Sequence, residues 1–118
     1  MNLILVAFGG SLGALARYAI GHLFSMTAIS TLVVNILGCF LSGALVYYFT
    51  KTPHEELSLL LIVGFLGSFT TYSTFNHQMI ELLEKNFLMF AYYLCAQVLL
   101  GLGAFMIGRY LATFFINK

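Results

Sequence analysis

Residues 64–75 read GFLGSFTTYSTF, a polar stretch inside an apolar segment that runs from about residue 57 to residue 80. Glycines and clustered Ser and Thr hydroxyls weaken a helix because they offer the backbone other conformations and hydrogen bonds. Irregular backbone at membrane depth is tolerated only where protein buries it or water lines it. Broken membrane helices also turn carbonyls toward cations and amide ends toward anions. The stretch therefore predicts a break in a membrane-spanning helix, of the kind that can hold an ion, and the alternative is an unbroken helix rich in Ser and Thr.

The composition around this stretch indicates that lipid is the solvent for most of the surface. Apolar residues make up 61% of the 118-residue chain and charged residues only 8%, against about 25% charged in soluble domains. Four apolar segments reach the roughly 20 residues that a bilayer core requires, at about residues 3–24, 29–49, 57–80 and 87–115. We therefore predict an all-α integral membrane protein in which residues 1–118 form a single four-helix domain.

Small residues recur at the spacing that brings membrane helices together. Gly9 and Gly13 form a GxxxG pair in the first span, and Gly101, Ala104 and Gly108 share one face of the fourth. Helix association in lipid relies on close van der Waals approach, which small residues allow. Because the connections are only a few residues long, neighbouring spans are expected to pack as a tight bundle.

The second span carries a narrow polar stripe. Thr31, Asn35, Gly38 and Ser42 are spaced by four, three and four residues, which places them on one helix face. An amide in hydrocarbon requires a specific partner because its donors are otherwise unsatisfied. We therefore expect Asn35 to bond to a defined group, with simple interhelical bonding as the alternative to an ion-binding role.

The distribution of charge favours an anion over a cation. The four glutamates are assigned to loops, the sequence has no aspartate, and Arg17 is the only charge far from a span end. A proton-coupled exporter of cationic drugs requires an intramembrane carboxylate, so that function is disfavoured. No nucleophile–base pair or metal cluster indicates an enzyme. The net charge of +1, without a basic cluster, argues against nucleic acid as a partner. The positive charges are balanced between the two sides, so the chain is expected to insert in either orientation.

Three motifs in order resemble those of the Fluc family of fluoride channels, also called CrcB. They are GGSLGALARY at residues 9–18, TLVVNILGCF at residues 31–40, and the stretch at residues 64–75. A lone GxxxG pair would be weak evidence, whereas this ordered set covers nearly the whole chain and is highly specific.

The resemblance implies a fluoride-exporting, multi-pass protein of the inner or plasma membrane. It is expected to form an antiparallel, dual-topology homodimer with two fluoride pathways and a central structural sodium ion, held by the backbone carbonyls of Gly67 and Thr70 of both subunits. It places Arg17 near the aqueous entrance and the ring edge of Phe75, the positive part of the aromatic quadrupole, against the anion. The side chains that it assigns to the fluoride pathway are Arg17, Thr31, Asn35, Tyr72, Ser73, Thr74 and Phe75.

The chain departs from the family pattern at three places. Tyr72 stands where a phenylalanine is usual, Gln78 stands where a glutamate is usual, and the fourth span lacks a serine pair. Gln97 and Thr113 are the uncharged polar side chains that the fourth span has instead. These departures leave open a second reading, in which the chain is one subunit of a heterodimeric fluoride channel. A small dual-topology multidrug transporter and a purely structural membrane protein are the remaining alternatives.

Overall fold

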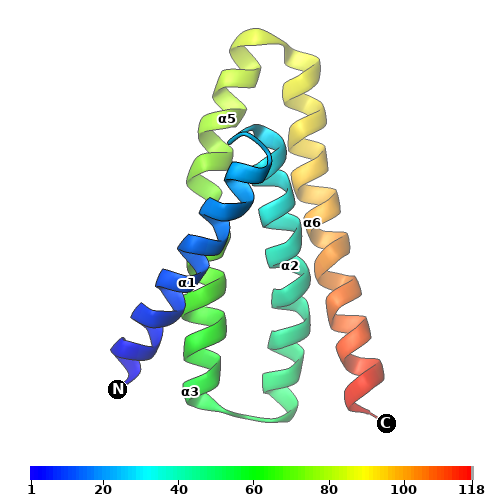
Figure 1. Cartoon of the computed structure of the whole chain (residues 1–118). Helices are drawn as coiled ribbons and strands as arrows, with labels where there is room; N and C mark the ends of the chain where they lie inside the picture. The colour runs from blue at the N-terminus through cyan, green and yellow to red at the C-terminus, as the bar shows by residue number, and fades with distance from the viewer. Residues whose placement is uncertain (118) are drawn as a thin grey trace.

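The computed structural model describes residues 1–117 and contains four helical segments long and apolar enough to cross a membrane. They are α1 (Asn2–Leu23), α2 (Ala28–Lys51), a composite third span (Glu55–Lys85) and α6 (Phe87–Ile116). Figure 1 shows that the two ends of the chain lie at the same end of the bundle. The predicted all-helical architecture with four spans is confirmed, and each helix extends one to five residues beyond one or both of its predicted ends.

The third span is interrupted where the sequence predicts it. Its parts are α3 (Glu55–Ser58), the π-helical segment η1 (Leu59–Leu66), α4 (Gly67–Phe69) and α5 (Tyr72–Lys85). Thr70 and Thr71 between α4 and α5 are extended, with φ/ψ of −77°/156° and −145°/114°. The helix break is therefore confirmed, and it is confined to two residues.

The first half of the third span packs against α1 through direct backbone contact. A methyl group added at Gly9 would overlap the carbonyl oxygen of Leu60, and one added at Gly13 would overlap the carbonyl oxygen of Phe65. Both glycines are buried. The GxxxG pair therefore serves as predicted, since only glycine allows α1 to approach η1 this closely.

The second close pair is α2 with α6. A Cβ atom at Gly43 would overlap the carbonyl oxygen of Phe105, and one at Gly108 would overlap that of Phe40. Gly101, Ala104 and Gly108 are all buried, as their shared helix face predicts. These contacts hold α6 along α2, and α6 then continues beside α5.

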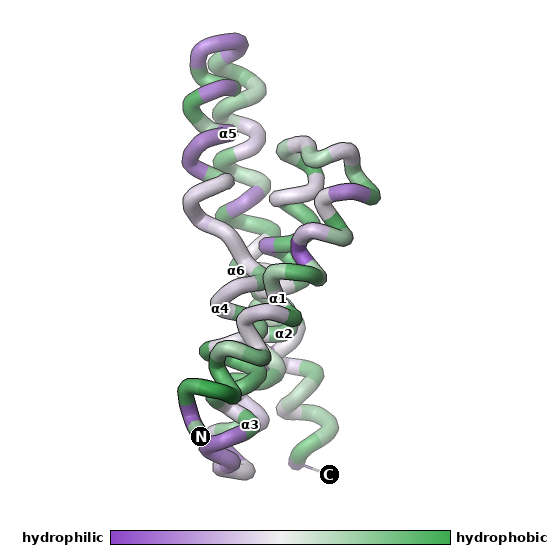
Figure 2. Tube along the Cα trace, turned by 60° about the vertical axis from the view of Figure 1, so that its left-hand side comes forward, coloured by the Kyte–Doolittle hydropathy of each residue, from purple (hydrophilic) through white to green (hydrophobic). Residues whose placement is uncertain are grey.

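The outer surface is apolar, as lipid requires. Leu3, Leu99 and Phe115 are 86%, 66% and 72% exposed, whereas the buried core is small and centres on Val34, Leu66 and Phe69. Figure 2 shows hydrophobic residues over most of the trace and hydrophilic ones at the far end of α5. Burial inside this single chain is thus limited, and most apolar side chains face outward.

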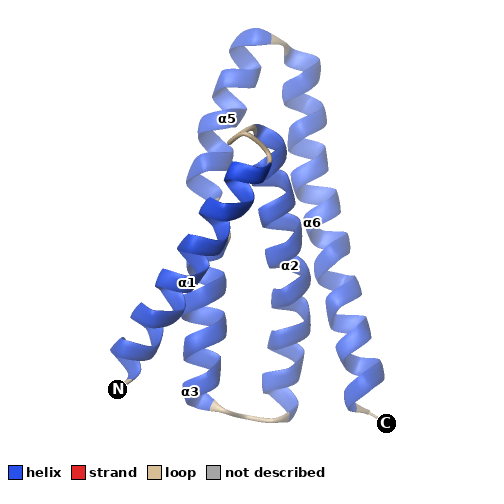
Figure 3. Ribbon diagram, viewed as in Figure 1, coloured by secondary structure: helices blue, strands red, loops and turns tan. Residues whose placement is uncertain are grey.

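The assignment of the glutamates to loops is wrong. Glu55 and Glu56 open α3, and Glu81 and Glu84 lie on α5. Carboxylates at a helix N-terminus are favoured by the helix dipole, and all four glutamates are exposed. Figure 3 shows the short loops that remain between the helices. The turn between α5 and α6 is Asn86 alone, whose Oδ1 accepts from the N–H groups of Leu88 and Met89 at 2.9 and 3.3 Å.

Candidate functional site

The polar backbone exposed by the break is bonded by side chains from α1 and α2. Asn35 Oδ1 accepts from Thr71 N at 2.9 Å, and Asn35 Nδ2 donates to Thr71 O at 3.2 Å. Arg17 Nη1 donates to Thr70 O at 3.3 Å. The expectation that Asn35 has a specific partner is confirmed. An interrupted helix in hydrocarbon is stable here because both extended residues find partners.

Thr71 also starts the next helix. Its Oγ1 accepts from Thr74 N at 3.2 Å and lies 3.0 Å from Thr74 Oγ1, to which it donates. Threonine is a favoured N-cap because its hydroxyl satisfies an N–H that has no partner inside the helix. Thr71 was part of the sequence motif but was not singled out as a site residue, although it is the residue to which Asn35 bonds.

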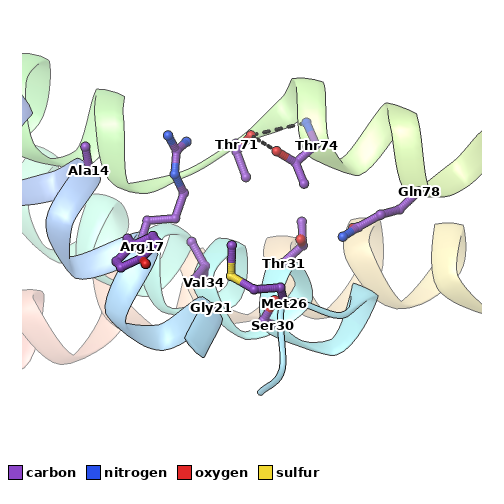
Figure 4. A pocket seen from close by; sticks show the side chains of 11 residues that line it. Ala14, Arg17, Gly21, Met26, Ser30, Thr31, Val34, Thr71, Thr74 and Gln78 are labelled. Atoms are coloured by element: carbon purple, nitrogen blue, oxygen red, sulfur yellow. Dashed lines mark hydrogen bonds between the residues drawn. The ribbon is translucent and has the colours of Figure 1, made fainter. Parts of the chain in front are cut away.

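A first cavity of about 360 Å³, the Arg17 cavity, lies on one side of the break. Its lining brings together three of the predicted pathway residues, Arg17, Thr31 and Thr74. The other lining residues are Ala14, Tyr18, Gly21, Met26, Ser30, Val34, Thr71 and Gln78. Figure 4 shows Arg17 reaching toward the third span and the amide nitrogen of Gln78 pointing toward Thr31. Figures 1 and 2 show the α1–α2 turn well short of the α5–α6 turn, so that the end of α5 projects past the α1–α2 turn.

A second cavity of about 520 Å³, the Asn35 cavity, lies on the other side of the break. It is lined by three further predicted pathway residues, Asn35, Tyr72 and Phe75, and by the two proposed sodium ligands, Gly67 and Thr70. The other lining residues are Gly38, Cys39, Ser42, Ile62, Leu66, Thr71, Gln97, Val98 and Phe105. Thr71 lines both cavities, so the break is the partition between them.

The two aromatic residues of the motif have different surroundings. Phe75 is 8% exposed and lies between Tyr72 and Tyr93, with ring centroids 5.8 and 5.6 Å away. Tyr72 is 74% exposed. Because the Phe75 ring is buried and packs against the buried Tyr93 ring, its orientation toward the Asn35 cavity is fixed within one chain. That of Tyr72 is not.

Three residues extend the polar site beyond the prediction. Gln97 Oε1 accepts from Asn35 Nδ2 at 3.3 Å, Gln97 Nε2 donates to Tyr93 Oη at 3.0 Å, and Tyr93 Oη donates to Gln78 Oε1 at 2.6 Å. Gln78 and Gln97 had been noticed only as departures from a family pattern. Tyr93 carries no signal in the sequence because it is one of many aromatic residues in an apolar span. The three residues link the Asn35 cavity to the Arg17 cavity.

Ser73 is the one predicted pathway residue that lines neither cavity. It is exposed, and its Oγ lies 3.5 Å from Thr71 Oγ1. Its pathway role stays a prediction.

The expected sodium ligands, Gly67 and Thr70, both offer backbone carbonyl oxygens. Gly67 is exposed, and a Cβ atom there would meet only Ile62 O, at 3.8 Å, so its backbone is open to approach. Carbonyl oxygens suit a hard cation, and the end of a helix favours positive charge. The Thr70 carbonyl already accepts from the Arg17 guanidinium. One chain therefore supplies oxygen ligands that suit sodium, but only part of a coordination shell.

Comparison with known proteins gives a consistent result. The chain matches the family described as "CrcB-like protein, Camphor Resistance (CrcB)" over residues 4–109. It is 38% identical to a protein of Oceanobacillus iheyensis over 96% of this chain and 92% of that protein. It is 40% identical to one of Dehalococcoides mccartyi over 95% and 92%. It is 37% identical to one of Nitratidesulfovibrio vulgaris over 91% and 93%.

All three relatives are named "Fluoride-specific ion channel FluC". They are channels and not enzymes, and the four apolar helices agree with a multi-pass membrane protein. From the match over residues 4–109 and identities of up to 40% along nearly the whole length, the chain belongs to the CrcB family.

Proposed function

We propose that this protein is a fluoride-selective channel that lets fluoride leave the cytoplasm passively and so lowers fluoride toxicity. The observation that carries the proposal is the Asn35–Thr71 contact at the helix break. It gathers neutral hydrogen-bond donors at membrane depth between two cavities that share Thr71. The relatives' names supply the identity of the anion.

The proposed pathway follows these two cavities. Fluoride enters the Arg17 cavity, where the guanidinium provides the positive charge that draws an anion toward the break. It then passes Thr31 and Thr74, and reaches Asn35 and the edge of the Phe75 ring in the second cavity. Hydroxyls, amide donors and an aromatic edge each replace part of the lost hydration shell without binding the ion irreversibly.

The choice of an anion follows from the charges around the break. Residues 1–117 place no carboxylate in either cavity lining, and the one charged lining residue is Arg17. A cation passing through the Arg17 cavity would meet the guanidinium without a compensating negative group in its lining. This arrangement supports a fluoride channel over a proton-coupled cation exporter.

A second copy of the chain is proposed to complete the Asn35 cavity. The cavity contains an amide and irregular backbone, which cannot face lipid at membrane depth. It also contains Tyr72, which is largely exposed in one chain. An antiparallel partner would cover this face and give two equivalent pathways. The balanced positive charge agrees with insertion in both orientations.

A sodium ion is proposed at the centre of this dimer. The Gly67 and Thr70 carbonyls of the two copies would together hold it, and the ion would offset the helix-end charge that the break leaves facing the partner. Because Arg17 already donates to Thr70 O, the ion is expected to bind through the remaining lone pair of that carbonyl.

The side-chain contacts favour a homodimer over a heterodimer. Gln78 and Gln97, which depart from the family pattern, bond to Tyr93 and Asn35 within the same chain. These two departures are therefore satisfied within one chain, and neither requires a second gene product as a partner. Co-expression with a homologous chain tests this: activity that appears only with the partner would favour the heterodimer.

The function is tested with purified protein in liposomes loaded with potassium fluoride or potassium chloride. We expect rapid fluoride release and retained chloride. Fluoride release no faster than from loaded liposomes without protein would overturn the proposal of a homodimeric channel. Mass measurement in detergent tests the dimer, and a tag at Met1 that is accessible from both sides of the membrane tests dual topology.

A further inference from the structure

A continuous line of four side chains runs through the bundle from the Asn35 cavity to the Arg17 cavity. Asn35 donates to Gln97, Gln97 donates to Tyr93, and Tyr93 donates to Gln78. Every donor points the same way along this line, and none of the four groups is a carboxylate or an ammonium. The second and third members lie on α6, four residues apart, and so occupy one face of that helix.

The orientation of the amides in this line is fixed by the backbone at the break. Thr71 N–H can only donate and Thr71 C=O can only accept, so Asn35 must present Oδ1 to the first and Nδ2 to the second. Because Asn35 Nδ2 donates toward Gln97, the amide oxygen of Gln97 must be the acceptor. Its nitrogen is then left to donate to Tyr93.

Both hydrogens of the Asn35 amide are therefore already donated within the chain. One hydrogen of Nδ2 goes to Thr71 O at 3.2 Å and the other to Gln97 Oε1 at 3.3 Å. An anion that accepts a hydrogen bond from Asn35 must therefore displace one of these acceptors. Thr71 O belongs to the backbone of the break, to which Asn35 makes two hydrogen bonds. Gln97 Oε1 sits at the end of a flexible side chain that is only half-buried, so it is the acceptor that can move.

We propose that Gln97 is a positioning residue that occupies the Asn35 donor whenever fluoride is absent and releases it when fluoride arrives. This inference rests on the proposed function, since it assigns a role within the fluoride pathway. Gln97 acts through Asn35: its oxygen satisfies the amide in the empty pathway and competes with the ion in the occupied one.

Such a competitor tunes how tightly fluoride is held. Conduction requires binding that is favourable enough for entry and weak enough for exit. An internal acceptor on Asn35 weakens binding by about the strength of one hydrogen bond. It also speeds departure, because the empty site does not leave a buried donor unsatisfied.

The test measures the initial rate of fluoride efflux from liposomes against internal fluoride concentration for the full-length protein and for Gln97→Leu. We expect the half-saturating concentration to fall roughly 2- to 12-fold, the change that corresponds to a hydrogen bond of about 0.5–1.5 kcal/mol. The maximal rate is expected to fall as well, because exit slows. A purely structural role would lower the amount of active protein without shifting the half-saturating concentration.

Gln97→Asn is the second variant, because it keeps a polar amide in the bundle but is one methylene too short to reach Asn35 in the same way. It is expected to shift the half-saturating concentration in the same direction as Gln97→Leu. Thr113→Val is the matched control: it removes a polar side chain of α6 that lines neither cavity and whose hydroxyl donates to Arg109 O in its own helix, at 2.8 Å. The control should keep the wild-type concentration dependence.

The outcomes separate this inference from the proposed function. If the wild-type protein releases no fluoride, the proposed function fails and the role of Gln97 fails with it. Suppose instead that the wild type conducts, while every Gln97 variant that folds shows the same half-saturating fluoride concentration as the wild type, or a higher one. In that case only the inference about Gln97 is overturned. A fall in either variant, with Thr113→Val unchanged, supports it.

Discussion

The two sides of the helix break are held in opposite ways. On the α1 side, Gly9 and Gly13 bring backbone against the backbone of η1, in a contact made of atoms that cannot rotate away, and Arg17 adds one side-chain bond, to Thr70 O. On the α2 and α6 side, Asn35 and Gln97 reach the break region through side-chain amides.

We call the glycine contact of α1 with η1 the structural joint, and the amide contacts of Asn35 and Gln97 the exchangeable joint. Close-packed backbone has a single arrangement, because a shift of a few tenths of an ångström already produces overlap. An amide can exchange one acceptor for another at little net cost, because each hydrogen bond is replaced by a similar one. The first joint fixes where the break lies, and the second offers an ion the donors that it requires.

The largest effect is expected at the structural joint. Gly13→Val should prevent α1 from seating on the third span, since even a methyl group would overlap Phe65 O. We expect almost no monodisperse protein in detergent, with a destabilisation beyond the roughly 1–3 kcal/mol typical of overpacking. Gly103→Ala is the control, because a Cβ atom there meets nothing within 4 Å in the chain. Wild-type yield for Gly13→Val would show that the joint is not rigid.

The next effect is expected at the exchangeable joint. Asn35→Ala removes the donor from the pathway and both contacts to Thr71. We predict that fluoride efflux falls about 10- to 100-fold, the change that corresponds to a loss of roughly 1.4–2.8 kcal/mol from the site. The chain should still fold, because the glycine contacts of α1 with η1 and of α6 with α2 are untouched, and it should elute at the wild-type size. Size-exclusion chromatography and liposome efflux on the same preparation check both parts. Full flux would mean that Asn35 is not in the pathway.

A smaller effect is expected at the aromatic contact. Phe75→Ala should lower fluoride efflux roughly 2- to 12-fold without separating the proposed dimer, since an aromatic contact contributes about 0.5–1.5 kcal/mol. Phe75→Leu keeps an apolar side chain of similar size beside Tyr93 and removes the ring edge. If the ring edge matters, the two variants lose similar activity. Recovery in Phe75→Leu would assign Phe75 to packing instead.

The smallest effect is expected at the cap of α5. Thr71→Val removes the hydroxyl that accepts from Thr74 N but keeps the backbone groups that Asn35 binds. We expect a loss of about 1 kcal/mol of stability and a two- to threefold fall in efflux. Thr71→Ser should restore both, as thermal unfolding and efflux measurements would show. A loss as large as that of Asn35→Ala would indicate that the hydroxyl itself contacts the ion.

The sequence was sufficient to predict the features that follow from local chemistry. The spans follow from apolar length, the break from glycine and hydroxyl content, and the helix contacts from the spacing of Gly9 and Gly13. The need of Asn35 for a specific partner was also predictable, because a buried amide cannot remain unbonded.

What could not be predicted depends on the rotation of one helix against another. Gln97 and Asn35 are far apart in the chain, and nothing local indicates that α6 turns Gln97 toward α2. Tyr93 is indistinguishable in sequence from its lipid-facing neighbour Tyr92, although the structure buries the first and exposes the second. The ends of the third span were missed for a different reason. Charged residues end the apolar segment in the sequence, but in the structure they continue the helix on its exposed faces.

The most direct test of the account is a side-by-side fluoride efflux measurement on wild-type protein and Asn35→Ala, reconstituted at equal protein density and each repeated with chloride. The account predicts rapid release of fluoride and retention of chloride by the wild type, and fluoride release slowed at least 10-fold in an Asn35→Ala dimer that is still assembled. Equal release by the two proteins, or chloride release by the wild type at the fluoride rate, would contradict it.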